Sequence, residues 1–236
     1  MVRASLSAVV AQVLALLIAR PELVEGRAAR SWFDGLTTSG VGQPERGGAA
    51  AVAETILWGA PIIASDHTRD LPRDAQERLI QFRQRERMFH TSLKPPPGAT
   101  SVEEALFEQR VAIERVLFCL FPRGDIFRVA AAYASDAEIE PEWNGQSDPP
   151  RHEAAFIDSL LRDLPQPWLG PYLHLIAGHR KLCASQLEGT DPAAVRQELA
   201  AEAKRQIAHA RDGGQPIVRV VAEYLLKTEQ CGEPRP

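Results

Sequence analysis

The most concentrated positive charge beside an apolar helical stripe is His179-Arg180-Lys181. An imidazole can exchange a proton near neutral pH, and a guanidinium group can hold an anion. If His152 or Glu153 met His179 and Arg180 in one cleft, they would form an enzyme site of unrecognised family. Scatter of these residues over the surface would exclude that hypothesis. We favour a structural or solvent-exposed role for them, because ion-pair networks also gather such residues.

The histidine spacings do not predict a metal site. His174 and His179 are five residues apart, which places them about 140° apart around a helix axis. Ligands on one helical face need a spacing of three or four. His152-Glu153 begins like a His-Glu-x-x-His zinc motif, but Phe156 stands where the second histidine is required. We therefore expect no metal and no cofactor.

The three cysteines, Cys119, Cys183 and Cys231, do not form a Cys-x-x-Cys pair either. Cys119 lies in the apolar run LFCLF, which is typical of a small core residue. In an oxidising compartment, a disulfide between Cys183 and Cys231 would fix the C-terminal tail to a helix. Three free thiols are the alternative.

Trp143 is the remaining candidate, because it lies in the longest polar loop, residues 138–150, and precedes Asn144-Gly145. A tryptophan in such a loop is either a stacking platform for a ligand or an anchor that folds back onto the protein. We favour the anchor. The candidate ligand-binding residues are therefore Trp143, His152, His179 and Arg180. The chain has no nucleophile elbow and no glycine-rich phosphate loop, and whether it is an enzyme stays open.

The elements that must position these residues are helices, since apolar residues recur at intervals of three and four and no alternating strand pattern competes. Residues 55–64 are expected to be irregular because Gly59-Ala60-Pro61 interrupts them. Six or seven helices with short connections predict an all-α fold, either an antiparallel helical bundle or stacked helical hairpins. In the first half of the chain, the expected helices cover residues 70–93, residues 101 to 122–124 after a capping box at 101, and residues 125 to about 135. In the second half, one helix begins at the Asp148-Pro149 cap and another covers residues 168–187. A further helix runs from the Asp191-Pro192 cap to Gly213-Gly214, and the last begins at Pro216.

Residues 4–19 form an apolar run after Arg3. As a helix the run would span roughly 24 Å, shorter than a membrane core, which is typical of a signal peptide. A buried N-terminal helix is the alternative. Beyond residue 54 no apolar run is long enough to cross a membrane, so we expect no stable span after signal removal.

Residues 20–42 contain the blocks PELVEG and SWFDGLTTSG. They resemble the translation of an interspersed DNA repeat found in bacterial genomes, and the resemblance implies no fold or activity. If residues 20–46 are left out, the sequence reads LALLIA, then GGAAAVA, and then Glu54. This order is typical of a signal peptide with an Ala-x-Ala cleavage site before Glu54. We therefore expect a signal-like segment at 1–19, a low-structure linker at 20–53 and one helical domain at 54–236.

The composition and net charge of the chain argue against some classes of function. The chain has 236 residues, 44% of them hydrophobic and 25% charged, with a formal net charge of -4. An acidic balance argues against a nucleic-acid partner. We expect an exported, periplasmic or secreted, non-enzymatic protein of the bacterial envelope that binds an unidentified protein or small molecule. The alternatives are an enzyme that uses His179 and Arg180 in a cleft, and a cytoplasmic helical protein.

Overall fold

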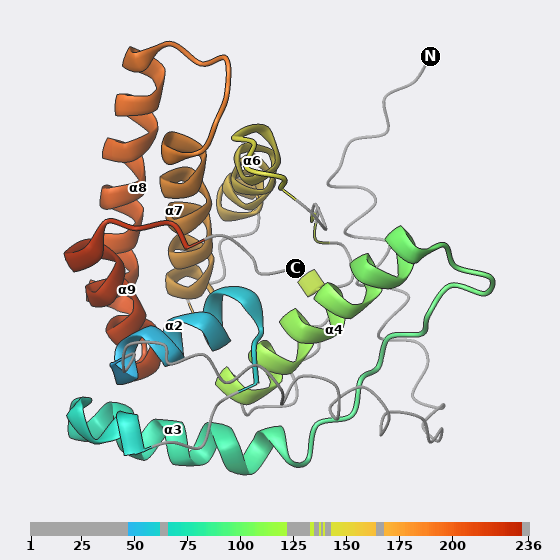
Figure 1. The fold of residues 1–236 in the computed structure, drawn as a ribbon. Coiled ribbons are helices and arrows are strands. Elements are labelled where there is room, and N and C mark those ends of the chain that lie inside the picture. Colours follow the sequence, from blue (N-terminus) through green and yellow to red (C-terminus); the bar gives the residue numbers. More distant parts are fainter. Residues whose placement is uncertain are drawn as a thin grey trace, which may run out of the picture. The chain divides into compact units, whose positions relative to one another are not determined.

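The computed structural model describes residues 47–61, 66–121, 133–134, 137, 139, 143–163 and 168–232. Seven α-helices and one 3-10 helix lie in this described part, and its only bridge between extended residues joins Gln146 and Glu188 (Figure 1). The all-α class predicted from the sequence is confirmed. The N-terminal apolar run, the repeat-like segment and most of the helix predicted at 125–135 lie outside the described residues.

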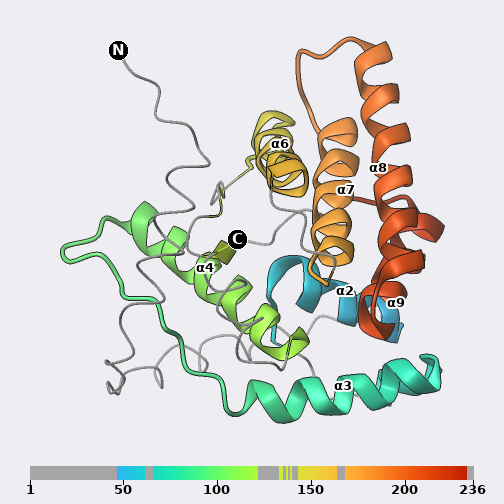
Figure 2. The same cartoon turned by 180° about the vertical axis from the view of Figure 1, so that it is seen from behind.

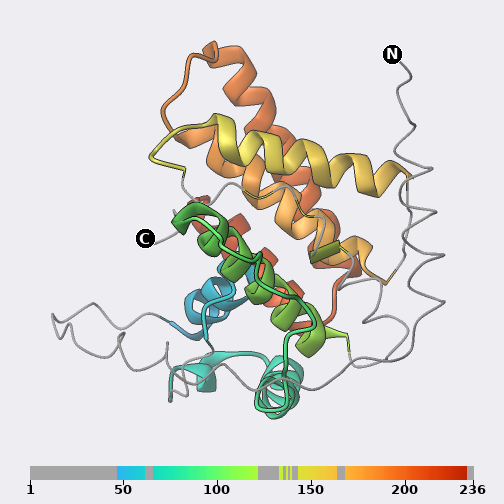
Figure 3. The ribbon, with the colours of Figure 1, turned by 90° about the vertical axis from the view of Figure 1, so that its right-hand side faces the viewer.

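Three helices lie side by side: α6 (Asp148–Asp163), α7 (Gly170–Gln186) and α8 (Ala193–Gly213) (Figures 1 and 3). The middle helix, α7, is buried along most of its length, since twelve of its 17 residues are buried. The backbone of α8 approaches α7 closely at Gly178. A Cβ atom at Gly178 would lie 2.7 Å from Cγ1 of Ile207 and 3.1 Å from the carbonyl oxygen of Ala203. Glycine at this position is therefore what allows α7 and α8 to pack so closely.

The remaining helices pack around α9 (Pro216–Thr228). This helix contacts α7 and α8, and also α2 (Gly48–Trp58) and α3 (Arg73–Glu86). Figure 2 shows α2 lying between α9 and α4 (Ser101–Leu120), both of which it contacts. The side chains buried on α9 are Ile217, Val218, Val220, Val221, Ala222 and Leu225. The apolar face of this helix is thus in the core.

Helical structure begins earlier in the chain than the sequence predicted. Helix α2 begins at Gly48, so residues 48–53 are helical, and residues 55–58 of the segment predicted to be irregular are helical as well. Val52 and Ala53 of this helix are buried, and its last residue is followed by Gly59 at a φ of 66°. Gly59-Ala60-Pro61 therefore ends the helix, and does not prevent it. A chain cleaved before Glu54 would lose the first six residues of α2.

The helix predicted at 70–93 is shorter than expected. Asp70 ends the 3-10 helix η2 (Asp66–Asp70), and α3 ends at Glu86. The chain then turns and continues without regular secondary structure, and the buried carboxylate of Glu114 on α4 binds it there. That carboxylate accepts hydrogen bonds from Oγ1 of Thr91 at 2.6 Å and from the backbone N–H of Ser92 at 3.1 Å. A tertiary contact therefore overrides the helical periodicity of this segment.

Two caps also differ in detail from the prediction. The capping box of α4 is one residue earlier than expected, between Thr100 and Glu103. Asp191 does not cap α8, since Pro192 precedes the first turn, and the Asp191 carboxylate instead binds Arg151 at 2.8 Å. The helix starts near Asp148 and at Pro216 and the end of α8 at Gly213 agree with the sequence prediction. In the described part of the chain, no helix has the length and apolarity needed to cross a membrane.

Candidate functional site

Three of the four candidate ligand-binding residues meet in the interior, and the fourth does not. Trp143, His179 and Arg180 are buried close together, whereas His152 is exposed on α6. The next residue of α6, Glu153, points inward and joins the buried group. His152 therefore does not converge with His179 and Arg180, whereas Glu153, the alternative partner, does so in the buried interior.

The guanidinium group of Arg180 is the centre of this group. Its Nε donates to Oε2 of Glu153 at 2.6 Å, its Nη1 to Nδ1 of His179 at 2.7 Å, and its Nη2 to the carbonyl oxygen of Leu57 at 3.3 Å. Arg180 is 7% exposed and Glu153 is 5% exposed. A buried charge of this kind is tolerated only with a paired counter-charge and hydrogen bonds, and both are present here.

Two tryptophan rings enclose the guanidinium group. The Arg180 Cζ atom lies 4.3 Å from the ring centroid of Trp58 and 5.2 Å from that of Trp143, which are cation–π distances. Nε1 of Trp143 donates to Oε1 of Glu153 at 3.2 Å, so the indole and the guanidinium group share one carboxylate. Trp143 is thus an anchor folded into the interior. We name Trp58, Trp143, Glu153, His179 and Arg180 the Arg180 cluster.

His179 is held in one tautomer by its neighbours. Because Nη1 of Arg180 can only donate, Nδ1 of His179 accepts, and the imidazole proton resides on Nε2. Nε2 then donates to the carbonyl oxygen of Cys231 at 2.7 Å. Burial and the adjacent Arg180 charge lower the pKa of His179 to about 3, against the opposing effect of the Cys231 carbonyl. A neutral imidazole with both nitrogens engaged is poorly suited to general acid–base catalysis at neutral pH.

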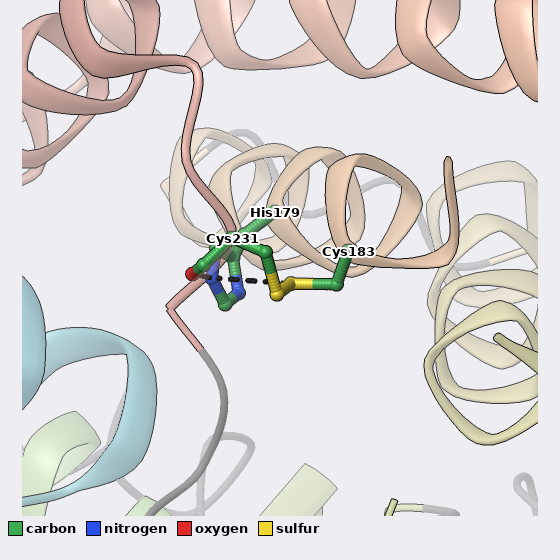
Figure 4. A group of neighbouring side chains, drawn as sticks. All are labelled: His179, Cys183 and Cys231. Carbon is green, nitrogen blue, oxygen red and sulfur yellow. Dashed lines mark hydrogen bonds between the residues drawn. A yellow bond between two sulfur atoms is a disulfide. The ribbon is translucent and has the colours of Figure 1, made fainter. Parts of the chain in front are cut away.

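A disulfide between Cys183 and Cys231 lies next to His179 of the Arg180 cluster. Cys183, one turn after His179 on α7, is bonded to Cys231 in the segment that follows α9, with the two Cα atoms 4.6 Å apart (Figure 4). This segment is also fixed by the side-chain amide of Gln186. The amide oxygen accepts from the backbone N–H of Cys231 at 3.0 Å, and the amide nitrogen donates to the carbonyl oxygen of Glu229 at 2.5 Å. The C-terminal segment thus lies against α7 through covalent and polar contacts.

Lys181, the last residue of the predicted positive feature, is paired as well. Lys181 is buried, and its Nζ atom lies 2.7 Å from a carboxylate oxygen of Asp158 on α6 and 2.5 Å from one of Glu202 on α8. Arg180 and Lys181 therefore join neighbouring helices to α7 through ion pairs, and their charges are already matched by carboxylates.

Sequence reasoning missed two features of this site. Trp58 was not considered, since its segment was expected to be irregular. The spacing between His179 and Cys183 was not weighed, although residues four apart share one helical face. In the structure Nε2 of His179 lies 3.5 Å from Sγ of Cys183, and the potential ligand atoms of His179, Cys183 and Cys231 all lie within 4.8 Å of one another (Figure 4).

The comparisons with known proteins assign no family. No family model matches this chain, and neither a curated protein nor a solved structure is similar to it. The chemistry of the site therefore rests on its own geometry. That geometry is a buried ion pair, a neutral histidine and a disulfide, which together fix α2, α6, α7 and the C-terminal segment to one another.

Proposed function

We propose that this chain is an exported, non-enzymatic helical protein of the bacterial envelope that binds a protein or small-molecule partner, and that the Arg180 cluster stabilises its fold. The observation that carries the proposal is the disulfide between Cys183 and Cys231, which covers the cluster. Protein disulfides form and persist mainly in oxidising compartments. The apolar run at residues 4–19 is consistent with the same destination.

A structural role fits the site better than catalysis does. His179 is neutral with both nitrogens engaged, Arg180 and Lys181 are paired, and His152 lies apart on the surface. None of these side chains is placed to transfer a proton or to attack a substrate. Because Val52 and Ala53 are buried in α2, we expect processing of an exported chain before Gly48, and not before Glu54.

Export is tested by fractionating cells that express the chain at native level and alkylating thiols without reductant. We expect an envelope species that retains residues 48–53 and carries one alkyl group after denaturation, on Cys119. A cytosolic species with three alkylated thiols would refute export. Native mass spectrometry of the envelope species tests the binding role, for which we expect a non-covalent complex. Recovery of the bare chain alone would count against a binding function.

A further inference from the structure

Cys183 and Cys231 join the C-terminal segment to α7, and we call this contact the C-terminal joint. The geometry of His179, Cys183 and Cys231 at this joint indicates a second role besides holding the disulfide. We propose that, when the disulfide is reduced, these three side chains bind one Zn²⁺ ion. The inference goes beyond the proposed function and does not depend on export. In oxidising surroundings the joint is closed by a disulfide, and in reducing surroundings it is closed by the metal.

The ligand atoms are already close to the positions that zinc requires. Tetrahedral zinc with Zn–S bonds of about 2.3 Å and Zn–N bonds of about 2.0–2.1 Å places a sulfur and a nitrogen ligand about 3.5 Å apart. Nε2 of His179 and Sγ of Cys183 are 3.5 Å apart. Once the disulfide is broken, the Cys231 sulfur completes the set by moving away from Cys183. All three residues are buried and their ligand atoms lie within 4.8 Å of one another.

The elements that carry the ligands suit a metal site. His179 and Cys183 are four residues apart on one face of α7, so a rigid helix fixes two ligands. Cys231 comes from the segment after α9, which Gln186 positions independently of the disulfide. Three protein ligands leave the fourth position of the zinc ion to a water molecule.

The charge balance also permits the metal. Two thiolates neutralise Zn²⁺, so the buried ion pair of Arg180 and Glu153 gains no net charge beside it. Binding at Nε2 of His179 moves the imidazole proton to Nδ1. The Nη1 group of Arg180 then turns away from Nδ1, whereas its Nε can stay on Glu153.

The chemical steps are reduction followed by metal binding. In vitro, a trialkylphosphine and one water molecule convert the disulfide into two thiols, and the phosphine is oxidised to its oxide. In a cell, a dithiol reductant would be oxidised to its own disulfide instead. Zn²⁺ then replaces the two thiol protons, which pass to the buffer, and no electrons are transferred in this second step.

The test is a Zn²⁺ titration of the full chain carrying Cys119→Ala, which removes the buried free thiol from the count. The chain is reduced with phosphine, the phosphine is removed under anaerobic conditions, and the reduced chain is compared with the oxidised chain. Co²⁺ serves as the spectroscopic probe of the metal site. We expect one equivalent of Zn²⁺ and a cobalt–thiolate absorption band in the reduced chain, and neither in the oxidised chain. Failure of the reduced chain to bind more Zn²⁺ than the oxidised one would overturn the inference, as would binding only after the helical circular-dichroism signal is lost.

Variants then identify the ligands. Cys183→Ser and Cys231→Ser should each weaken the cobalt–thiolate band, since one thiolate ligand of the two is lost, and the double variant should abolish it. His179→Gln keeps a hydrogen-bond acceptor for Arg180 and a donor for the Cys231 carbonyl, but it removes the imidazole ligand. Loss of a group that only supports a ligand weakens metal binding by about 10–100-fold, so loss of this ligand should weaken Zn²⁺ binding at least as much. His152→Gln, on the exposed face of α6, is the matched control and should bind as the parent does. Equal affinity in the His179→Gln and His152→Gln chains would contradict the assignment.

Discussion

Replacing Glu153 by glutamine removes the carboxylate that pairs with Arg180, and the expected loss of stability can be worked out from the structure. The side chains of Arg180 and Glu153 are 8% and 6% exposed and the bond between them measures 2.6 Å. Breaking a buried ion pair from one side costs about 3–5 kcal/mol, because the other charge stays buried without a partner. Arg180 keeps its bonds to His179 and Leu57 and its contact with Trp58. We therefore expect Glu153→Gln to lower the free energy of unfolding by about 3–4 kcal/mol.

Denaturant unfolding followed by circular dichroism measures this loss, with tryptophan fluorescence as a second probe. Glu77→Gln is the matched control, since Glu77 forms an ion pair with Arg73 in which the side chains are 63% and 92% exposed. Removing an exposed pair of this kind costs less than about 1 kcal/mol. If the Glu153→Gln and Glu77→Gln chains differed by less than about 1 kcal/mol, the Arg180–Glu153 pair would not have the structural role assigned to it.

Three further predictions follow from the same region. The pKa of His179 is lowered to about 3 in the folded chain, so the unfolded chain binds the proton preferentially below about pH 6.5, and stability attributable to His179 should fall by about 1.4 kcal/mol per pH unit from there to about pH 3. Urea unfolding across this range should show a shallower pH dependence for His179→Gln than for the wild-type chain, and an equal dependence would contradict the lowered pKa of His179. Gly178→Ala should cost about 1–3 kcal/mol in thermal unfolding through overpacking against Ile207, and an unchanged midpoint would exclude the close approach of α7 and α8. Replacing both disulfide cysteines by serine should cost about 4 kcal/mol of unfolding free energy, as loop-closure entropy gives for a sequence separation of 48, and a loss below about 1 kcal/mol would show that the bond constrains little.

The sequence predicted best those parts of the fold that depend on neighbouring residues. Pro216 before the apolar stripe of α9 and Gly213 at the end of α8 are local signals, and the structure follows them. The end of α3 was not predictable in the same way, since it depends on the Glu114 carboxylate more than twenty residues further along the chain. Local periodicity contains no information about such a partner.

The candidate site shows the same division. Residue type and position were enough to single out Trp143, His179 and Arg180, and to raise the pairing of Cys183 with Cys231. The sequence could not show that Glu153 would be the counter-charge of Arg180, or that Trp58 would cover its guanidinium group, because these contacts join α2, α6 and α7 in space. The sequence named Glu153 only as an alternative to His152 in a possible cleft with His179 and Arg180.

The central claim is that the Arg180 cluster is a structural element and not a catalytic site. Long-range proton–nitrogen NMR of the imidazole of His179 tests it most directly, because the two ring nitrogens report tautomer and charge separately. The hydrogen bonds to Arg180 and Cys231 predict a neutral ring with its proton on Nε2 and no titration from pH 8 down to about pH 4. A ring that titrates near its ordinary pKa of about 6.5, or that carries its proton on Nδ1 in the oxidised chain, would contradict the claim.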